Sequence, residues 1–219
     1  VNSDQLSDAF QALLDVAIGA ASSEQIIISN LLVAPTRGRQ VAQYYFSIPI
    51  SAGSRLSCKH QSSSVTGDLH VWFQLIGQGM VPSSPLGLVT PYGADTSDSG
   101  GMAVDPGGTV DTKGAYSELA ASTTYPIKQL MLVIGGRGNT TQLTQRVLID
   151  VAIGGAGSEQ IVFPDIGYGA NVGTDLGIPL VVGPYPVDIP AGTRLAVRAQ
   201  SSINNATDRL FDACLYGVS

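Results

Sequence analysis

The strongest constraint on the fold of this chain is a block of sequence that occurs twice. Residues 14–26 read LDVAIGAASSEQI, and residues 149–161 read IDVAIGGAGSEQI, at a constant offset of 135. In both copies, short apolar runs with β-branched residues flank a turn rich in Gly, Ser and Ala, a pattern typical of strand, turn and strand. The chain is therefore predicted to contain two copies of one structural unit.

Two further pairs of segments extend the repeat towards the C-terminus of each copy. Residues 50–56 (ISAGSRL) correspond to residues 189–195 (IPAGTRL), now at an offset of 139. Residues 71–77 (VWFQLIG) answer to residues 210–217, and both segments are predicted to be alternating strands. The change in offset indicates a four-residue insertion in the second repeat, which we expect in the surface segment 165–177.

One part of the second repeat has no counterpart in the first. Residues 115–119 and 127–134 read as two strands ahead of the second block, whereas the chain begins too late to hold their equivalents. The first repeat would then expose unpaired sheet edges, which natural proteins normally cover. These edges could be covered by upstream residues or by a neighbouring subunit, or the first repeat could consist of fewer strands. We expect upstream residues to supply the strands.

Length and composition predict an all-β protein of two domains. A chain of 219 residues fits two units of about 100 residues each. With 26 Gly, 12 Pro and few runs suited to helices, short strands joined by turns are favoured. We expect tandem duplicated antiparallel β-sandwiches, jelly-roll-like, over residues 1–79 and 112–219. The Gly-, Pro- and Asp-rich residues 80–111 between them are a linker or a long ordered excursion.

The charge balance narrows the range of partners. Only 13% of the residues are charged while 44% are hydrophobic, which favours extensive contacts with other subunits. The net charge of −6 repels a phosphate backbone, so we expect no nucleic-acid partner. No apolar run approaches the ~20 residues that span a bilayer, so membrane insertion is not expected either.

Charged residues recur at matching positions of the two repeats and form the clearest candidate constellation. They are Asp15, Glu24 and Arg55 in the first repeat, and Asp150, Glu159 and Arg194 in the second. Paired carboxylates roughly 5–10 Å apart could serve glycoside hydrolysis. Carboxylates beside turns also accept backbone hydrogen bonds and pair with arginine. We favour this structural role, and expect each glutamate to pair with the arginine of its own repeat.

Other residues are candidates for binding. Four aspartates of the linker supply oxygen ligands of the kind that calcium prefers, although their spacing matches no EF-hand: Asp95, Asp98, Asp105 and Asp111. Four tyrosines in or beside predicted loops could stack on sugars: Tyr44, Tyr92, Tyr168 and Tyr185. For the aspartates the simpler interpretation is a set of solvated turns, and for the tyrosines it is a position in the core or at a subunit interface. We expect no cofactor and no resident metal.

The two cysteines, Cys58 and Cys214, lie at positions that do not match between the repeats. Each falls in an alternating apolar run, where a small buried side chain is the expected role. Their wide separation makes no zinc pattern, and a disulfide between them requires that the repeats pack closely.

Several short motifs give the chain a family resemblance. The segments that carry it are 92–96 (YGADT), 104–109 (VDPGGT), 113–119 (KGAYSEL) and 121–123 (AST), followed by 157–160 (GSEQ) and 189–194 (IPAGTR). Together they resemble a repeat found in virion proteins of tailed bacteriophages, over most of the chain. The resemblance implies a β-rich structural or attachment role and no catalytic residues. The chain departs from it in lacking the start of the first repeat.

These observations predict a non-enzymatic virion protein, either a tail, fibre or receptor-binding component or a head decoration. Its expected partners are other virion subunits, with homo-oligomers formed through two similar domains, and a host-surface glycan is a further candidate. The alternatives are a tandem carbohydrate-binding module and, third, a glycan-cleaving enzyme that uses the repeated carboxylates.

Overall fold

The protein is all-β, as the composition predicts. A computed structural model describes residues 11–33, 42–63, 69–77, 87–136, 145–170, 180–207 and 209–219. Thirteen strands and no helix occur in these segments. Accordingly, no helix in the described part of the chain is long and apolar enough to cross a membrane.

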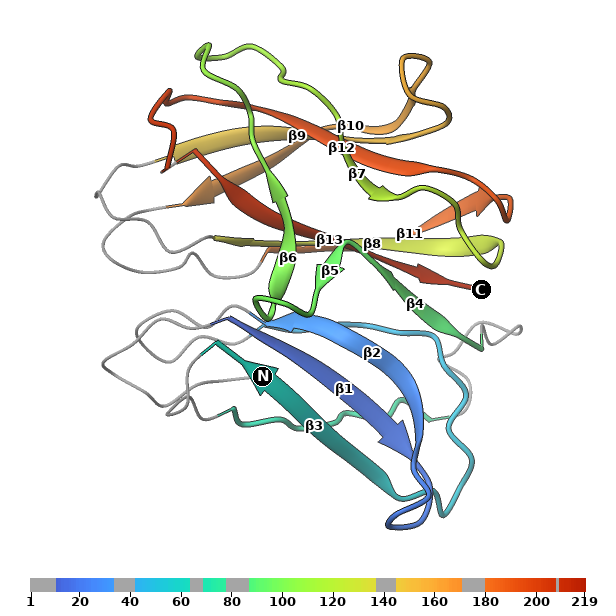
Figure 1. The fold of residues 1–219 in the computed structure, drawn as a ribbon. Helices are drawn as coiled ribbons and strands as arrows, with labels where there is room; N and C mark the ends of the chain where they lie inside the picture. Colours follow the sequence, from blue (N-terminus) through green and yellow to red (C-terminus); the bar gives the residue numbers. More distant parts are fainter. Residues whose placement is uncertain are drawn as a thin grey trace.

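The second repeat forms a β-sandwich of two antiparallel sheets (Figure 1). One sheet has the order β10 (Gln160–Ala170), β9 (Gln145–Ile153), β12 (Leu195–Ser201) and β7 (Ser117–Ala120). The facing sheet contains β11 (Leu180–Ile189), β8 (Ile127–Gly136) and β13 (Phe211–Val218). β8 lies between β11 and β13, and it pairs with β13 over all eight residues of that strand.

The first core fills the space between these two sheets, because alternate side chains of each strand point inward. The residues that face it include Leu130, Leu132 and Ile134 of β8, Ile149 and Val151 of β9, Leu195 and Val197 of β12, and Phe211 and Leu215 of β13. The intervening residues of β8 and β13 point to the opposite face of their sheet.

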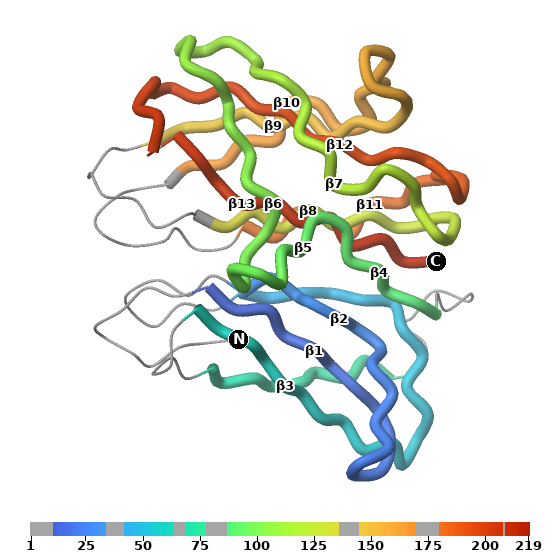
Figure 2. Tube along the Cα trace, viewed as in Figure 1, coloured from blue at the N-terminus to red at the C-terminus, as the bar shows by residue number. Residues whose placement is uncertain are grey.

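The first repeat continues the sheet that contains β8 and β13. Beyond β13 come β4 (Val89–Tyr92), β2 (Gln25–Val33), β1 (Ala12–Ile18) and β3 (Leu56–Ser62). The two parts of this sheet are joined by one parallel backbone pair, Ile28 of β2 with Val89 of β4. From there the chain brings β2, β1 and β3 beneath β8 and β13, so that three layers of strands are visible (Figures 1 and 2).

A second core lies under the central sheet, on the face opposite the first core. Met131 and Val133 of β8, with Cys214 and Tyr216 of β13, pack there against the apolar residues of β1 and β2. The hydroxyl of Tyr216 donates to the Asn30 carbonyl at 2.7 Å and accepts from the Leu32 amide at 2.7 Å. The central strands are therefore buried on both faces and belong to both cores.

The repeated blocks have the same strand order and the same register. β2, β1 and β3 are arranged as β10, β9 and β12 are. Ile18 faces Leu56 and Ala12 faces Ser62, just as Ile153 faces Leu195 and Val147 faces Ser201. The hairpin register shifts in both copies across the same two positions, which leaves a β-bulge at the same place in each.

Within the described residues, segment 80–111 is an ordered excursion, the second of the two possibilities that the sequence leaves open. The described part of the expected linker contains strands β4, β5 (Ala94–Asp95) and β6 (Gly100–Val104), and both β4 and β6 pair with β13. Gly and Pro are compatible with strands at a sheet edge or where pairing is interrupted. Pro91 meets this condition, because the backbone pairing of β4 with β2 is confined to Val89 among the described residues.

The first repeat also differs from the separate sandwich that the sequence predicts. Within the described residues its three strands share a sheet with the second repeat. By the offset of 139, residues 42–50 correspond to residues 181–189 of β11, and segment 71–77 corresponds to the region of β13. Neither segment of the first repeat is a strand, apart from an isolated bridge residue at His70 just before the second one. In the second repeat β8 lies between β11 and β13 and pairs with both, and no described strand of the first repeat takes the corresponding place.

The expected insertion at 165–177 lies only partly within the described residues. Residues 165–170 belong to β10, and residues 171–177 fall outside the described segments.

Candidate functional site

Asp15 and Asp150 hold the β-bulge of their own repeat. The amide of Asn30 donates to Asp15 Oδ1 at 2.8 Å, and the amide of Asp165 donates to Asp150 Oδ1 at 3.0 Å. Asn30 and Asp165 have φ of 52° and 50°, so each bulge places one residue in the left-handed region. The aspartate thus satisfies an amide that the bulge removes from the strand ladder, which explains why both repeats have it.

Cations also contact these aspartates, and here the two repeats begin to differ. Lys59 lies 3.4 Å from Asp15, and Arg198, at the matching position of the second repeat, lies 2.9 Å from Asp150. Asp150 has a second cation, Lys113, at 2.7 Å. Lys113 comes from the segment just ahead of β7.

The environment of Asp150 favours its charged form. Asp150 is 2% exposed, and this burial acts to raise the pKa of its carboxyl group. Hydrogen bonds from Lys113, the Asp165 amide and Arg198 act in the opposite direction and hold the pKa below its usual value. A carboxylate that is held ionised between two cations is suited to stabilise a fold, and it does not hold a proton for general acid catalysis.

The ion pair that the sequence predicts within each repeat is present in both copies. Arg55 Nη1 lies 2.9 Å from Glu24 Oε1, and Arg194 Nη1 lies 3.1 Å from Glu159 Oε1. Each arginine also donates from Nη1 to the carbonyl of a glycine that begins the hairpin turn, Gly19 just after β1 or Gly154 just after β9. These contacts tie the hairpin turn to the start of the third strand of each block.

The same contacts shift the pKa of both glutamates downward. For Glu24 the hydrogen bond from Arg55 is the main cause of the lowered pKa. For Glu159 the main cause is a hydrogen bond from its own backbone, with Arg194 contributing as well. Both glutamates are therefore carboxylates at neutral pH with a structural partner.

The surroundings of the two arginines differ markedly. Arg194 also donates from Nε to Glu118 of β7 at 2.7 Å, and its side chain is 14% exposed. Arg55 is 49% exposed, and among the described residues Glu24 is its one carboxylate partner. The difference arises because β7 pairs with β12 in the second repeat, whereas β3 is the last strand of its sheet.

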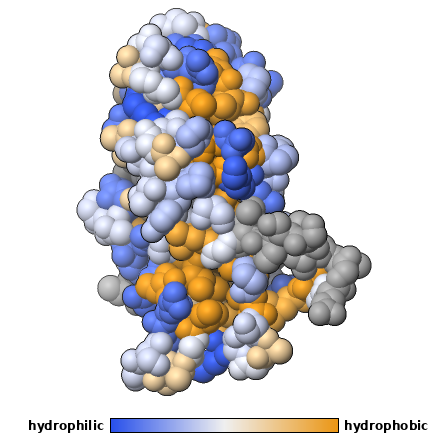
Figure 3. All heavy atoms as spheres, turned by 90° about the vertical axis from the view of Figure 1, so that its right-hand side faces the viewer, coloured by the Kyte–Doolittle hydropathy of each residue, from blue (hydrophilic) through white to orange (hydrophobic). Residues whose placement is uncertain are grey.

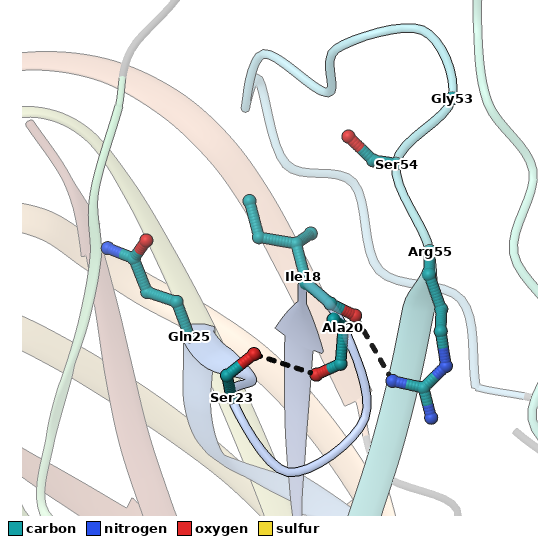
Figure 4. Close-up of a pocket in the computed structure, with 8 residues that line it drawn as sticks. Ile18, Ala20, Ser23, Gln25, Gly53, Ser54 and Arg55 are labelled. Carbon is teal, nitrogen blue, oxygen red and sulfur yellow. Dashed lines mark hydrogen bonds between the residues drawn. The ribbon is translucent and has the colours of Figure 1, made fainter.

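A shallow pocket of about 480 Å³ lies beside Arg55, between two turns of the first repeat (Figure 4). Its lining comes from the end of β1, the hairpin turn and the turn before β3: Ile18, Gly19, Ala20, Ser23, Gln25, Gly53, Ser54 and Arg55. The polar groups drawn there bond to one another, since Ser23 donates to the Ala20 carbonyl. Neither Asp15 nor Glu24 lines the pocket, so it does not bring the two carboxylates to one substrate site.

The four candidate tyrosines do not form a binding surface. Tyr92 and Tyr168 are 6% exposed and belong to the first core, because their strand positions point inward. Tyr44 packs against the second core and donates to the Leu32 carbonyl at 2.6 Å, and burial raises its pKa. Tyr185 alone of the four is exposed, with its ring against Phe163 at a centroid distance of 4.9 Å.

The four aspartates of the expected linker are turn and pairing residues. Asp95, Asp98 and Asp105 each accept a hydrogen bond from the amide two residues ahead, the pattern of an Asx turn. Asp105 also pairs with Arg209 through both carboxylate oxygens. Asp111 has φ of 56°. No group of three or more His, Cys, Asp or Glu side chains in the described residues is placed to hold a metal ion.

The two cysteines are not joined. Cys58 lies on β3 and is exposed, whereas Cys214 lies on β13 and is fully buried. The expectation that both are buried is therefore wrong for Cys58. Cys58 is exposed because β3 is the last strand of its sheet and no further described strand covers it. For Cys214, burial raises the pKa of the thiol to about 12.

The most unusual surface of the molecule is the open side of the first repeat. On β3 the middle residues are exposed, whereas its counterpart β12 is almost entirely buried. In segment 71–77 four large apolar side chains, Trp72, Phe73, Leu75 and Ile76, are 43–63% exposed, whereas every residue of β13 is buried. Figure 3 shows apolar side chains gathered on the lower half of the molecule, which holds the first repeat.

Known proteins add little to this description. No family model matches the chain, and no curated protein matches it either. Among solved structures, the chain is similar to one described as the structure of infectious bursal disease virus Gx strain, with 13% identity and a TM-score of 0.30. That match covers 98% of this chain and 57% of the viral chain.

Proposed function

We propose that this chain is a non-enzymatic structural or attachment component of a bacteriophage virion, which works through contacts with other protein subunits. The observation that carries the proposal is the exposed apolar side of the first repeat. A contiguous set of large apolar side chains on the surface of a protein marks a site of interaction. The resemblance of several sequence motifs to those of virion proteins of tailed bacteriophages directs the proposal to a phage particle.

The charged residues support a structural role in preference to a catalytic one. Each of the four repeated carboxylates contacts a cation and accepts backbone hydrogen bonds or ties down a turn. Glycoside hydrolysis needs one protonated and one ionised carboxyl at a common site. The low pKa of Glu24, Asp150 and Glu159 works against this arrangement.

Purified particles test the proposal directly. An antibody raised against residues 112–219 should label intact or gently opened virions, and the chain should stay with the particles through washes in high salt. Detection of the chain only in the soluble fraction of infected cells would contradict a virion role. A chain that stays at its monomeric mass of 22.6 kDa and binds glycans would favour the carbohydrate-binding alternative.

The enzymatic alternative has its own test. The chain and a double variant, Asp15→Asn with Glu24→Gln, are incubated with a panel of bacterial surface polysaccharides. We expect no turnover by either protein. Turnover that the double variant loses while it remains folded would replace the proposal with a glycan-cleaving function.

A further inference from the structure

One continuous block of the second repeat covers the surfaces that are open in the first. Within residues 112–136, Lys113 reaches Asp150, and Glu118 reaches Arg194. In the same block β7 covers the edge of β12, and β8 pairs along the whole of β13. A single segment of about 25 residues thus supplies one cation, one carboxylate and two strands.

Each charged residue that this block contacts in the second repeat has a counterpart in the first repeat. Asp15 and Arg55 take the places of Asp150 and Arg194, and both are more exposed than those residues. β3 ends its sheet, and segment 71–77 presents its apolar side chains at the surface. No other part of the described chain pairs with the outer edge of β3.

We propose that the open side of the first repeat docks a segment of a partner polypeptide that has the pattern of residues 112–136. The first part of the docked segment is a short strand along the outer edge of β3, with a carboxylate placed for Arg55 and an ammonium group that reaches Asp15. The second part is an apolar strand that lies along segment 71–77. Addition of a strand to an exposed sheet edge is an established mode of recognition between proteins.

The second repeat predicts the register of this contact. There, Leu195 faces Ala120, Ala196 faces Glu118 and Val197 faces Ser117. The offset of 139 transfers these positions to Leu56, Ser57 and Cys58. Cys58 therefore lies inside the expected contact, and its exposed thiol reports whether the edge is covered.

The partner is defined by chemistry that the second repeat displays. It needs an acidic residue opposite Ser57, a basic residue several positions earlier, and a following strand whose apolar residues alternate as those of β8 do. This inference rests on the proposed function in one respect, since it names what a subunit contact of the virion component consists of. It is tested on the isolated chain, so it can fail while the chain is still found in particles.

A synthetic peptide with the sequence of residues 112–136 is the probe. It contains neither tryptophan nor cysteine, and Trp72 is the only tryptophan of the chain. Titrated into the 219-residue protein, the peptide should shift the Trp72 emission to shorter wavelength in a saturable manner and slow the labelling of Cys58 at least tenfold. A scrambled peptide of the same composition should do neither.

A charge exchange identifies the site. Arg55→Glu in the protein should weaken binding of the peptide at least tenfold, and a peptide with Glu118→Arg should restore most of the affinity. Arg146→Glu, which changes an exposed arginine of β9 by the same charge, serves as the matched control and should leave binding unchanged.

Three results would overturn the proposal. The first is the absence of a saturable change, and the second is an equal response to the scrambled peptide. The third is a concentration-dependent blue shift of Trp72 in the protein alone, accompanied by a dimeric mass, because a second copy of the chain would then occupy this surface.

Discussion

β3 and β12 have the same place in their repeats and the same register against the preceding strand, yet their environments are opposite. β12 lies between β9 and β7 and is almost wholly buried, whereas β3 lies at the end of its sheet and is mostly exposed. The difference does not come from the repeated block itself, because the bulge, the aspartate and the ion pair occur in both copies. It comes from residues 112–136, which cover β12 and β13 in the second repeat, whereas no described strand covers the outer edge of β3.

The comparison separates two kinds of interaction. Contacts inside the block, such as the arginine–glutamate pair, form wherever the block occurs. Contacts that need the preceding segment, such as Lys113 to Asp150 and Glu118 to Arg194, form only in the second repeat. A substitution should therefore lower the free energy of unfolding more in the second repeat, where the residue is more buried, than at the matching position of the first.

The largest effect is expected at the paired aspartates. Asp150→Asn leaves Lys113 and Arg198 without their buried counter-charge and should lower the free energy of unfolding by about 3 kcal/mol. Asp15→Asn removes a partner of the well-exposed Lys59 and should cost about 1 kcal/mol or less. Urea denaturation of both variants measures the difference. Equal losses would show that Lys113 and burial contribute nothing at Asp150.

The pH dependence of stability gives a second test of the contribution of Asp150. The pKa of Asp150 is lower in the folded protein than its usual value, so its contribution is fully present above the unfolded pKa of about 4. The contribution is lost as the pH falls through the folded pKa. The difference in stability between the wild type and Asp150→Asn should therefore shrink below about pH 4.

Tyr216 tests how firmly the two repeats are joined. Tyr216→Phe removes a buried hydroxyl that bonds Asn30 and Leu32 of β2, and should lower the free energy of unfolding by about 1–2 kcal/mol. Tyr168→Phe is the matched control, since the Tyr168 hydroxyl is buried without a hydrogen-bond partner among the described residues. It should change stability by no more than about 0.5 kcal/mol. A similar loss in both variants would remove the special role of Tyr216.

The bulge of the first repeat gives a smaller effect. Asn30 has φ of 52°, a conformation that costs most L residues about 1–2 kcal/mol, and asparagine less. Asn30→Ala should therefore destabilise the protein by about 1 kcal/mol, whereas Asn30→Gly should be close to neutral. Thermal unfolding of the two variants checks this order, and a more stable alanine variant would contradict the assigned backbone conformation.

Thiol labelling compares β3 with β13 without any substitution. Cys58 should react with a thiol reagent in the folded protein, while Cys214 should react only after unfolding, because it is fully buried and its pKa is raised to about 12. Mass spectrometry should find one label before denaturation and two afterwards. Two labels on the folded chain would mean that the central sheet opens readily.

The repeat in the sequence predicts much of this arrangement. Equal spacing of the blocks predicts the matching hairpins, and the recurrence of Glu24 and Arg55 as Glu159 and Arg194 predicts their pairing, because charged residues that recur together at turns have a common local partner. The sequence also predicts unpaired sheet edges on the first repeat, although it does not say which strand carries them, and in the structure β3 ends its sheet.

Other features could not be read from local patterns. The strands at 89–104 are short and rich in Gly and Pro, so their order comes from pairing with β13, far away in the sequence. Tyr92 and Tyr168 look like loop residues in the sequence, and only the register of their strands shows that they point into the core. Segment 71–77 alternates as a strand does, but alternation alone does not supply the neighbour with which a strand must pair.

Hydrogen exchange at single-residue resolution tests the central comparison most directly. In residues 195–197, amides that point towards β9 or towards β7 should both be protected. In residues 56–58, amides that point towards β1 should be protected, while those on the outer edge should exchange at rates close to those of an unfolded peptide. Equal protection of residues 56–58 and 195–197 in the isolated chain would contradict the account, because it would mean that the edge of β3 is already covered.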